Sequence, residues 1–525
     1  MTEEVLGKTT GESPPQGSEC VMVADCGTSS VRAFIAEIPA TGDNYRILED
    51  LSFPIELTDS FVSGKLSRQT MDEVVEAFTS IMASAKNYQV KRIRAVGTSA
   101  LREAINSDVL VERLRGHLNV DLEVIDNAEE ARLYCDALRL LLQRGQKKLS
   151  GRTLMIDLGG GATCIGLIHK GKLIHSVDEH YGSVRILEQF QALRDSSEFA
   201  TTIDRYAMGA ARMILQRLPE GEINNLVITS GDVRKLCSLL RPQAKKGSIE
   251  PLAVKDVSAW YERMQSLTPS ERAKACGTDA RGAALLLPAA SLLRHLSKEI
   301  ASGRVLVPYL TLRDGLIADQ LPGSHGSYYL SSADLQAEGS QLVARYGGDQ
   351  AYAHNTASLA TQIFDQTATL HGMGERERAL LEFSALVHDI GSYINVRNRH
   401  KHSMYLIQSV DIAGLTVIEK EMVANIARYH RKSQPEPHHT EFQSLPRAKR
   451  VVVSHLAAIL RLAYGLDVER TQRIKKLRCE VNKGRLLMHV DRRQIALERW
   501  SLDNKAGMFA DVFGLQVVVV AREES

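Results

Sequence analysis

The sequence predicts two similar α/β lobes that face each other, followed by a helical region and a small segment that contains strands. Three observations lead to this prediction. A strand–turn–strand pattern occurs twice in the first third of the chain, helical periodicity dominates beyond residues 323–326, and residues 475–523 alternate apolar and polar side chains. Two copies of one unit are typical of paired lobes, so a cleft between the lobes would receive a turn from each.

The second copy of the pattern lies at residues 153–168. An apolar run ends at Asp157, three glycines (Gly159, Gly160 and Gly161) follow, and a second apolar run completes the unit. Glycines lack a Cβ atom, so their N–H groups can line a concave surface that an anion can approach. Asp157 would lie beside that anion, where a hydrated Mg²⁺ would also bind. The alternative is a hairpin that uses glycine only for turn geometry.

The first copy, at residues 21–36, repeats this layout. An apolar run ends at Asp25, Gly27 and small residues form the turn, and a second apolar run follows. Two unrelated glycine hairpins would seldom match so closely, so the pair favours two phosphate-binding turns in one cleft.

Composition limits the class of protein. At 525 residues the chain is long enough for three or four domains, and its 44% hydrophobic and 24% charged residues are ordinary for a globular protein. The net charge is only +2, so any basic surface is local and specific nucleic-acid binding is not expected. No apolar stretch approaches membrane-spanning length, so no membrane partner is expected.

The beginning of the chain and the cysteines predict the compartment. Residues 1–18 are polar and contain Gly, Pro and Thr, which predicts a disordered tail rather than a signal peptide. The seven cysteines are scattered and include no Cys-x-x-Cys pair. That pattern favours a reducing cytoplasm and argues against structural zinc.

Two charged residues of the first lobe are candidates for the chemistry. The strand at residues 91–97 leads into a helix start that carries Arg102, and anions bind at such junctions in α/β folds. Arg102 could therefore pair with a phosphate, although a solvated surface arginine has the same local pattern. Glu130 opens the helix after the strand at residues 122–125. It could act as a general base in the cleft or close a capping box with Asn127.

Several motifs occur in an order that is seen in one family. They are Val-Ala-Asp25-x-Gly-Thr-Ser-Ser, Gly97-Thr-Ser-Ala-Leu-Arg102, Asn127-Ala-Glu-Glu-Ala-Arg-Leu, Ile-Asp157-Leu-Gly-Gly-Gly, Ser230-Gly231, Leu312-Arg-Asp-Gly-Leu, His402-Ser-x-Tyr-Leu-Ile and Arg428-Tyr-His-Arg-Lys. With these motifs the chain resembles the exopolyphosphatase/guanosine pentaphosphate phosphohydrolase (Ppx/GppA) family over about residues 21–432.

The resemblance implies an α/β actin-like (ribonuclease-H-like) two-lobe fold, followed by an all-α HD-like domain and a small α+β C-terminal module. The expected parts are a disordered tail at 1–18, lobe I at 19–147, lobe II at 148–322, the HD-like domain at 327–472 and the module at 473–525.

The implied function is removal of a terminal phosphate from inorganic polyphosphate or of the 5′ phosphate from guanosine pentaphosphate (pppGpp), with Mg²⁺ or Mn²⁺. A homodimer is expected. In such phosphoryl transfers the enzyme mainly positions the water and stabilises charge on the phosphoryl oxygens. The alternatives are a catalytically weak sensor that binds polyphosphate or (p)ppGpp, and an actin-like-fold ATPase or kinase. An ATPase needs an adenosine-binding glycine pair, which the Ser230 segment does not supply.

The resemblance also assigns roles to residues. Glu130 matches the catalytic carboxylate, and Asp25 and Asp157 match the acidic residues that hold the metal. The phosphate-binding set comprises Gly27, Thr28, Ser29, Ser30, Arg102, Gly159, Gly160, Gly161, Ala162, Thr163, Ser230 and Gly231.

The chain departs from the family pattern at three positions near this cleft. Cys164 stands where the family usually has a glutamate implicated in metal or water handling, which predicts reduced activity or altered metal use. Ser29 replaces a common asparagine. Asp232 replaces a threonine and would repel an anion.

The helical domain keeps residues that many relatives have lost. His354 and the pair His388-Asp389 are residue types that hold divalent metals and predict a second metal site, although they could instead cap a core helix. Tyr464 stands where relatives with the site carry an aspartate. Two basic clusters are predicted to form an exposed channel for a long polyanion. Their members are Arg399, His400, Lys401, His402, Arg428, His430, Arg431 and Lys432.

Overall fold

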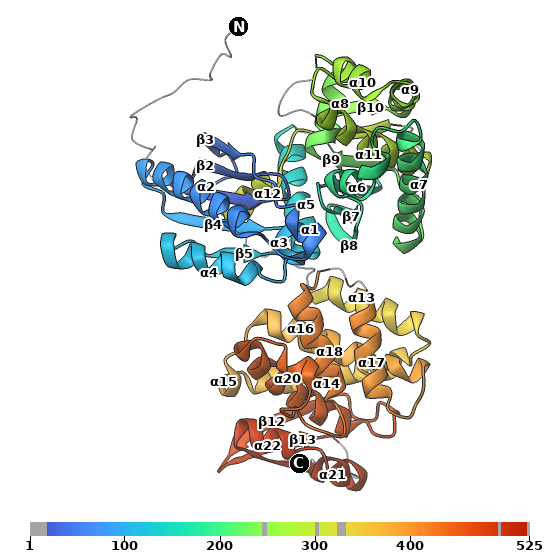
Figure 1. Cartoon of the computed structure of the whole chain (residues 1–525). Coiled ribbons are helices and arrows are strands. Elements are labelled where there is room, and N and C mark those ends of the chain that lie inside the picture. Colours follow the sequence, from blue (N-terminus) through green and yellow to red (C-terminus); the bar gives the residue numbers. More distant parts are fainter. Residues whose placement is uncertain are drawn as a thin grey trace. The chain divides into compact units, whose positions relative to one another are not determined.

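The computed structural model describes residues 18–145, 148–243, 249–299, 304–322, 332–410, 412, 414–491 and 495–521. The predicted tail, apart from Ser18, and the predicted linker at 323–326 lie outside these residues. The chain forms two compact units, Met1–Tyr328 and Tyr329–Ser525 (Figure 1). Among the described helices, none is long and apolar enough to cross a membrane.

The first sheet is built from the repeat unit at the start of the chain. Its strand order is β3-β2-β1-β4-β5, with β1, β2 and β3 antiparallel and with β4 and β5 parallel to β1. The strands are β1 (Glu19–Cys26), β2 (Val31–Ile38), β3 (Arg46–Phe53), β4 (Arg92–Gly97) and β5 (Leu122–Val124).

The second sheet repeats this topology and adds one strand at the edge. Its order is β10-β11-β9-β6-β7-β8, so β6, β7 and β8 correspond to β1, β2 and β3, while β9 and β11 correspond to β4 and β5. The strands are β6 (Arg152–Leu158), β7 (Thr163–His169), β8 (Lys172–Glu179), β9 (Asn225–Thr229), β10 (Ile249–Ala253) and β11 (Arg304–Pro308). The predicted repeat of two α/β lobes is therefore confirmed.

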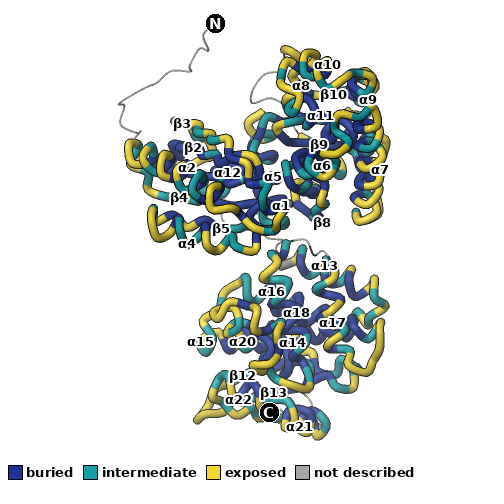
Figure 2. The backbone as a smooth tube through the Cα atoms, in the orientation of Figure 1, coloured by how far each residue is buried: buried dark blue, intermediate teal, exposed yellow. Residues whose placement is uncertain are grey.

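Helices cover both sheets, and their outer faces are exposed while the central strands β1, β2, β6, β7 and β9 are largely buried (Figure 2). They are α1 (Asp59–Ser63), α2 (Arg68–Asn87), α3 (Ser99–Glu103), α4 (Ser107–Leu118), α5 (Asn127–Arg144), α6 (Ser183–Gln189), α7 (Phe199–Arg217), α8 (Gly231–Leu240), α9 (Val254–Gln265), α10 (Pro269–Cys276), α11 (Ala280–Leu296) and α12 (Leu312–Gln320). Short 3₁₀ turns follow α6 and α11. Although α12 lies within the segment predicted as lobe II, it packs on α5, β1 and β2.

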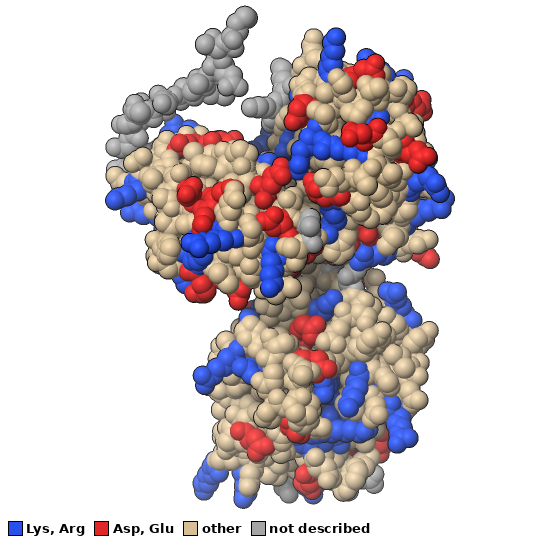
Figure 3. All heavy atoms as spheres, viewed as in Figure 1, with Lys and Arg blue, Asp and Glu red and all other residues tan. Residues whose placement is uncertain are grey.

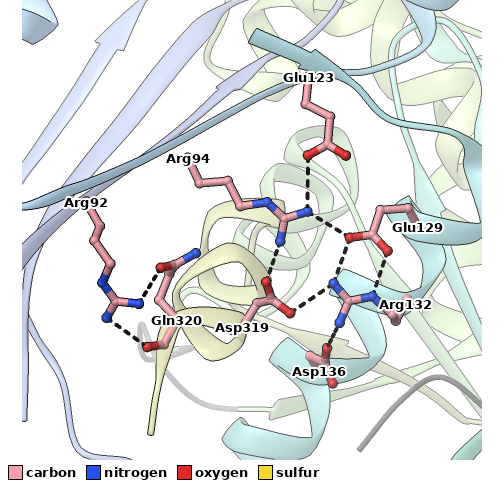
Figure 4. Close-up of polar contacts among 8 residues, drawn as sticks. All are labelled: Arg92, Arg94, Glu123, Glu129, Arg132, Asp136, Asp319 and Gln320. Atoms are coloured by element: carbon pink, nitrogen blue, oxygen red, sulfur yellow. Dashed lines mark hydrogen bonds and ion pairs between the residues drawn. The ribbon is translucent and has the colours of Figure 1, made fainter. Parts of the chain in front are cut away.

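An ion-pair network fixes α5 and α12 to the first sheet (Figure 4). Arg94 on β4 contacts both Glu129 at the start of α5 and Asp319 at the end of α12. Arg132 contacts the same two carboxylates, at 2.7 and 3.0 Å, and Asp136 at 2.8 Å. All five side chains are largely buried, so the network constrains where α5 begins. Glu129, the first glutamate of the Glu-Glu pair, therefore has a structural role.

The second unit is helical and ends in a small sheet. Its elements are α13 (Ser332–Arg345), α14 (Gln350–Gln366), α15 (Ala368–His371), α16 (Glu375–Val387), α17 (Arg399–Ser409), α18 (Val417–Arg428), α19 (Thr440–Gln443), α20 (Arg447–Leu466), β12 (Leu477–Asn482), β13 (Arg485–Val490), α21 (Ala496–Asp503), α22 (Gly507–Phe513) and β14 (Gln516–Ala521). A 3₁₀ turn, Ile390–Tyr393, follows α16. Apolar residues of β13 and β14 belong to the same core as the helices, so sheet and helices form one folded body.

Charged side chains are interspersed over the visible surface. Figure 3 shows Lys and Arg beside Asp and Glu on this face of both units. This distribution agrees with the small net charge of +2.

Candidate functional site

A cavity of about 240 Å³ in the first unit brings the two turns together. It is lined by the carboxyl ends of β1 and β6 and by the starts of the helices that follow β4, β5 and β9. Of the predicted phosphate set, the wall includes Gly27, Thr28, Ser29, Ser30, Arg102, Gly159, Gly160, Ala162, Ser230 and Gly231. The catalytic and metal candidates Glu130, Asp25 and Asp157 line the same wall.

Two residues of the predicted phosphate set lie behind the wall rather than on it. Thr163 is fully buried, and its hydroxyl donates a hydrogen bond to the carbonyl of Tyr181. A Cβ atom on Gly161 would lie 2.2 Å from the ring of Phe61, so the glycine permits close packing between the two lobes. Glycine at this position is therefore explained by packing.

Glu130 does not cap its helix. The N-cap of α5 is Asp126, whose carboxylate accepts a hydrogen bond from the N–H of Glu129 at 2.8 Å. The alternative reading, in which Asn127 and Glu130 form a capping box, is therefore wrong. Glu130 instead accepts a hydrogen bond from Arg102 at 2.8 Å, and both side chains are largely buried. Arg102 also donates to the carbonyl of Ile125 at 2.8 Å, which holds the guanidinium in place.

The two aspartates have different partners. Asp25 lies 3.3 Å from the guanidinium of Arg313, which α12 supplies. Burial raises the pKa of Asp25, and Arg313 opposes that rise. Asp157 accepts a hydrogen bond from Thr229, and burial raises its pKa to about 7, with a further contribution from the charge of Glu130.

The substituted residues Cys164 and Asp232 both lie on the cavity wall. Burial raises the pKa of the Cys164 thiol well above its usual range, so it stays protonated, and its Sγ lies 3.6 Å from the carbonyl oxygen of Asn127. Asp232 accepts a hydrogen bond from the Ser183 hydroxyl, and burial raises its pKa.

The sequence analysis missed several wall residues. Tyr134 lies one turn after Glu130 on α5, and this i, i+4 spacing would have found it. The pKa of its hydroxyl is raised well above the usual value by burial and by neighbouring carboxylates, and it shares a hydrogen bond with Asp157. Arg32, Arg234 and Arg281 also line the cavity, although no local motif marks them.

Comparison with known proteins identifies the family. The profile of the Ppx/GppA phosphatase family matches residues 47–324, and the profile of Ppx/GppA phosphatase domain III matches residues 336–506. The chain belongs to the Ppx/GppA phosphatase family.

Relatives are similar over most of their length. A guanosine-5′-triphosphate,3′-diphosphate pyrophosphatase of Aeromonas hydrophila is 26% identical over 438 residues, which cover 78% of this chain and 79% of the relative. The protein of the same name from Vibrio cholerae is 25% identical over 464 residues, with 85% and 88% covered.

Solved structures of the family share the fold. The Aquifex aeolicus family member has a TM-score of 0.51 at 20% identity, covering 59% of this chain and all of that one. An exopolyphosphatase from Cytophaga hutchinsonii has a TM-score of 0.52 at 21% identity, covering 58% and 98%. The expected actin-like two-lobe fold, followed by a helical domain and a small sheet, is confirmed by the family match and by the sheet topology.

The cavity fits the hard divalent cation that the resemblance to this family implies. Asp25 and Asp157 offer carboxylate oxygens of the kind that Mg²⁺ prefers. The Oδ1 atom of Asp25 is buried and accepts no hydrogen bond from the described residues. The raised pKa of Asp157 reflects a buried negative charge that lacks sufficient compensation, and a divalent cation would supply it.

The three residues predicted to form a second metal site do not form one group of ligand atoms in the described part of the chain. His354 is the residue that is left out, because its Nε2 lies 3.0 Å from the Ser340 hydroxyl and its Nδ1 lies 2.8 Å from the carbonyl oxygen of Gln350. His388 and Asp389 group instead with His430. The sequence analysis assigned His430 to the channel, because His430 lies on a different segment from the consecutive residues His388 and Asp389.

The basic clusters are less exposed than predicted. His400 and His430 are buried, Arg399 pairs with Asp389 at 2.5 Å, and Arg428 pairs with a glutamate of α19 at 3.0 Å. The expectation of eight exposed contacts is therefore wrong. Lys401 and Lys432 are exposed, and Arg431 and His402 are half-buried.

Proposed function

We propose that the chain hydrolyses the terminal phosphoanhydride bond of a linear polyphosphate, either inorganic polyphosphate or the 5′ triphosphate of guanosine pentaphosphate. The observation that carries the proposal is the Arg102–Glu130 pair, which lines a cavity between two turns rich in glycine and small hydroxyl residues. A guanidinium for the phosphoryl oxygens and a carboxylate for the water are what such a reaction requires.

The pair also suggests the order of events. Arg102 donates a hydrogen bond to Glu130 at 2.8 Å, so the guanidinium and the carboxylate each satisfy the other. A terminal phosphate competes for the guanidinium, since arginine binds phosphate oxygens strongly. Loss of this hydrogen bond frees the Glu130 carboxylate to orient a water molecule and accept its proton. The N–H group of Gly160 would stabilise the negative charge of the phosphoryl oxygens. That of Gly159 donates to the carbonyl of Ala162 at 2.9 Å and fixes the shape of the turn.

Asp25 and Asp157 are the residues that would hold Mg²⁺. When bound there, the ion would neutralise charge on the phosphates and help to orient them. The thiol of Cys164 is a poor ligand for Mg²⁺, so this chain would hold the ion with fewer hard oxygens than its relatives do.

The choice between the two substrates is open to direct measurement. The relatives from Aeromonas hydrophila and Vibrio cholerae are named for the guanosine nucleotide, which favours testing it first. Purified protein is incubated with Mg²⁺ and either pppGpp or long polyphosphate, and the rate of phosphate release is measured for each substrate.

The decisive variant is Glu130→Gln, which keeps an oxygen that can accept from Arg102 but removes the base. We expect phosphate release to fall by about 10²–10⁴-fold with the fold intact. Glu129→Gln is the matched control. Glu129 binds Arg94 and Arg132, so this variant loses stability but keeps the turnover of its folded fraction within a few-fold. Retention of most turnover by Glu130→Gln would remove that residue from the mechanism.

A second candidate function is a sensor that binds these polyphosphates without useful turnover. Cys164 in place of a glutamate favours it. Tight binding of pppGpp or polyphosphate by the wild type, with no Mg²⁺-dependent phosphate release, would select this reading.

Two exposed lysines of the helical unit support a preference for long chains. Lys401 and Lys432 are exposed, and a long polyanion has more phosphates with which to contact them than a short one has. The double variant Lys401→Gln, Lys432→Gln should raise KM for long polyphosphate and leave triphosphate unchanged. Equal changes for both lengths would confine binding to the cavity.

A further inference from the structure

The helical unit contains a group of ligand atoms that the proposed hydrolysis does not use. His388 caps the end of α16, Asp389 follows it, and His430 lies two residues beyond α18. One ligand atom from each lies within 4.8 Å of the others. We propose that His388, His430 and Asp389 bind one divalent transition-metal ion, with the Nε2 atoms of both histidines as ligands.

Hydrogen bonds fix both imidazoles in the form that binds metal. The Nδ1 atom of His388 lies 2.7 Å from the carbonyl oxygen of Ala385, and that of His430 lies 2.6 Å from the carbonyl oxygen of Ala427. Because a carbonyl oxygen can only accept, each Nδ1 carries the proton and each Nε2 keeps its lone pair. A backbone carbonyl that holds the second ring nitrogen is typical of metal-binding histidines.

The two lone pairs face the interior. His388 and His430 are both fully buried, and their ring centroids are 4.8 Å apart. The Nε2 of His430 has no hydrogen-bond partner in the described part of the chain, although it is inaccessible to solvent. Leaving a buried acceptor without a partner costs free energy, which a ligand would recover.

Asp389 is held by two arginines that compete with a metal. Its Oδ1 lies 2.5 Å from Nε of Arg399, and its Oδ2 lies 2.8 Å from the guanidinium of Arg470. Arg470 is the residue that can leave, because 35% of its side chain is exposed against 12% for Arg399. Tetrahedral ligands about 2.1 Å from an ion are about 3.4 Å apart, so a small movement of Asp389 away from Arg470 would close the site.

The ligand types select the ion. Imidazole nitrogens favour Zn²⁺, Co²⁺ and similar ions, whereas Mg²⁺ prefers oxygen ligands alone. The site is therefore chemically distinct from the carboxylate cavity of the first unit. Three protein ligands leave at least one coordination position open for water or another small ligand.

Full-length protein freed of metal with a chelator is titrated with Co²⁺, whose visible absorption reports its ligands. With excess Mg²⁺ present to occupy the carboxylate cavity of the first unit, we expect one Co²⁺ per chain with nitrogen and oxygen ligands, and no thiolate charge-transfer band from the cysteines. His430→Ala should weaken Co²⁺ binding by about 100-fold. His354→Ala is the matched control and should leave the affinity within about threefold.

A variant that loses a buried histidine could lose affinity only because it misfolds. A second variant is therefore chosen that should gain affinity. Arg470→Met removes a competing cation at a partly exposed position, so Co²⁺ should bind about tenfold more tightly. The proposal is overturned if the wild type binds no Co²⁺, if the spectrum shows cysteine ligands, or if His430→Ala and His354→Ala lose affinity equally. None of these readouts uses phosphate release, so they are independent of the proposed hydrolysis.

Discussion

The two glycine turns are copies of one backbone unit but differ in charge. In the first turn, the residue paired with Asp25 across the β1–β2 ladder is Arg32. In the second turn, the residue paired with Asp157 across the β6–β7 ladder is Cys164. Side chains of directly opposed residues lie on the same face of a sheet, so Asp25 has a cation beside it where Asp157 has a neutral thiol.

Tertiary packing widens this difference. Arg313 from α12 adds a second cation beside Asp25, at 3.3 Å, and its guanidinium also lies over the ring of Phe34. Asp157 receives hydroxyl donors from Thr229 and Tyr134 instead. The second turn is therefore where a bound cation is most needed. A backbone repeat therefore preserves the shape of a glycine turn without preserving the charge around it.

The largest expected effect separates the two aspartates in catalysis. Asp157→Asn should lower Mg²⁺-dependent turnover by about 10²-fold or more. It removes a carboxylate whose pKa burial raises to about 7, although the charge of Arg234 opposes that rise. Asp25→Asn should cost about tenfold, since Arg313 and Arg32 already offset that charge. Steady-state rates at several Mg²⁺ concentrations give both values. Equal losses would mean that the two turns share the ion evenly.

The same contrast should appear in stability without metal. The folded state raises the pKa of Asp157 from 3.8 to about 7, so the folded protein holds this proton more tightly than the unfolded chain. Stability from this group is complete below about pH 4 and is lost as the pH rises through about 7. In the presence of a chelator, the free energy of unfolding of Asp157→Asn relative to that of the wild type should therefore increase by on the order of 2 kcal/mol as the pH rises from 5 to 8. Urea unfolding measures the difference, and a pH-independent difference would contradict it.

The hydroxyl of Tyr134 tests the hydrogen bonding of the second turn. Tyr134→Phe removes its hydrogen bond to Asp157 and keeps the ring. We expect the apparent affinity for Mg²⁺ to fall about tenfold with little change in the maximal rate. Loss of maximal rate at saturating Mg²⁺ would instead give Tyr134 a part in the chemical step.

The smallest effect concerns the thiol itself. Cys164→Glu places a carboxylate opposite Asp157, where it adds a hard oxygen ligand for Mg²⁺. Apparent Mg²⁺ affinity should rise by about threefold, and Cys164→Ser, which adds no charge, should leave it unchanged. A decrease in Cys164→Glu would show that the local geometry has adapted to the thiol.

Local patterns predicted much of the fold and of the cavity. Apolar runs, glycine turns and helix starts depend on residues close in sequence. They sufficed for the two-lobe repeat and for bringing Arg102, Glu130 and most residues of the two glycine turns to one cavity. Gly161 and Thr163 were assigned to the wall because a local motif does not distinguish a residue facing a cavity from one packed behind it.

The sequence by itself determined the order of the elements, the repeat and the residue types available for chemistry. Only the tertiary structure decided which charges are balanced and which ligands meet. Arg313 lies late in the sequence of the first unit but contacts Asp25 near its beginning. His430 rather than His354 lies close to His388 and Asp389. The physical reason is that burial and ion pairing depend on contacts between segments that are distant in sequence. A local sequence pattern does not specify which of these segments come together.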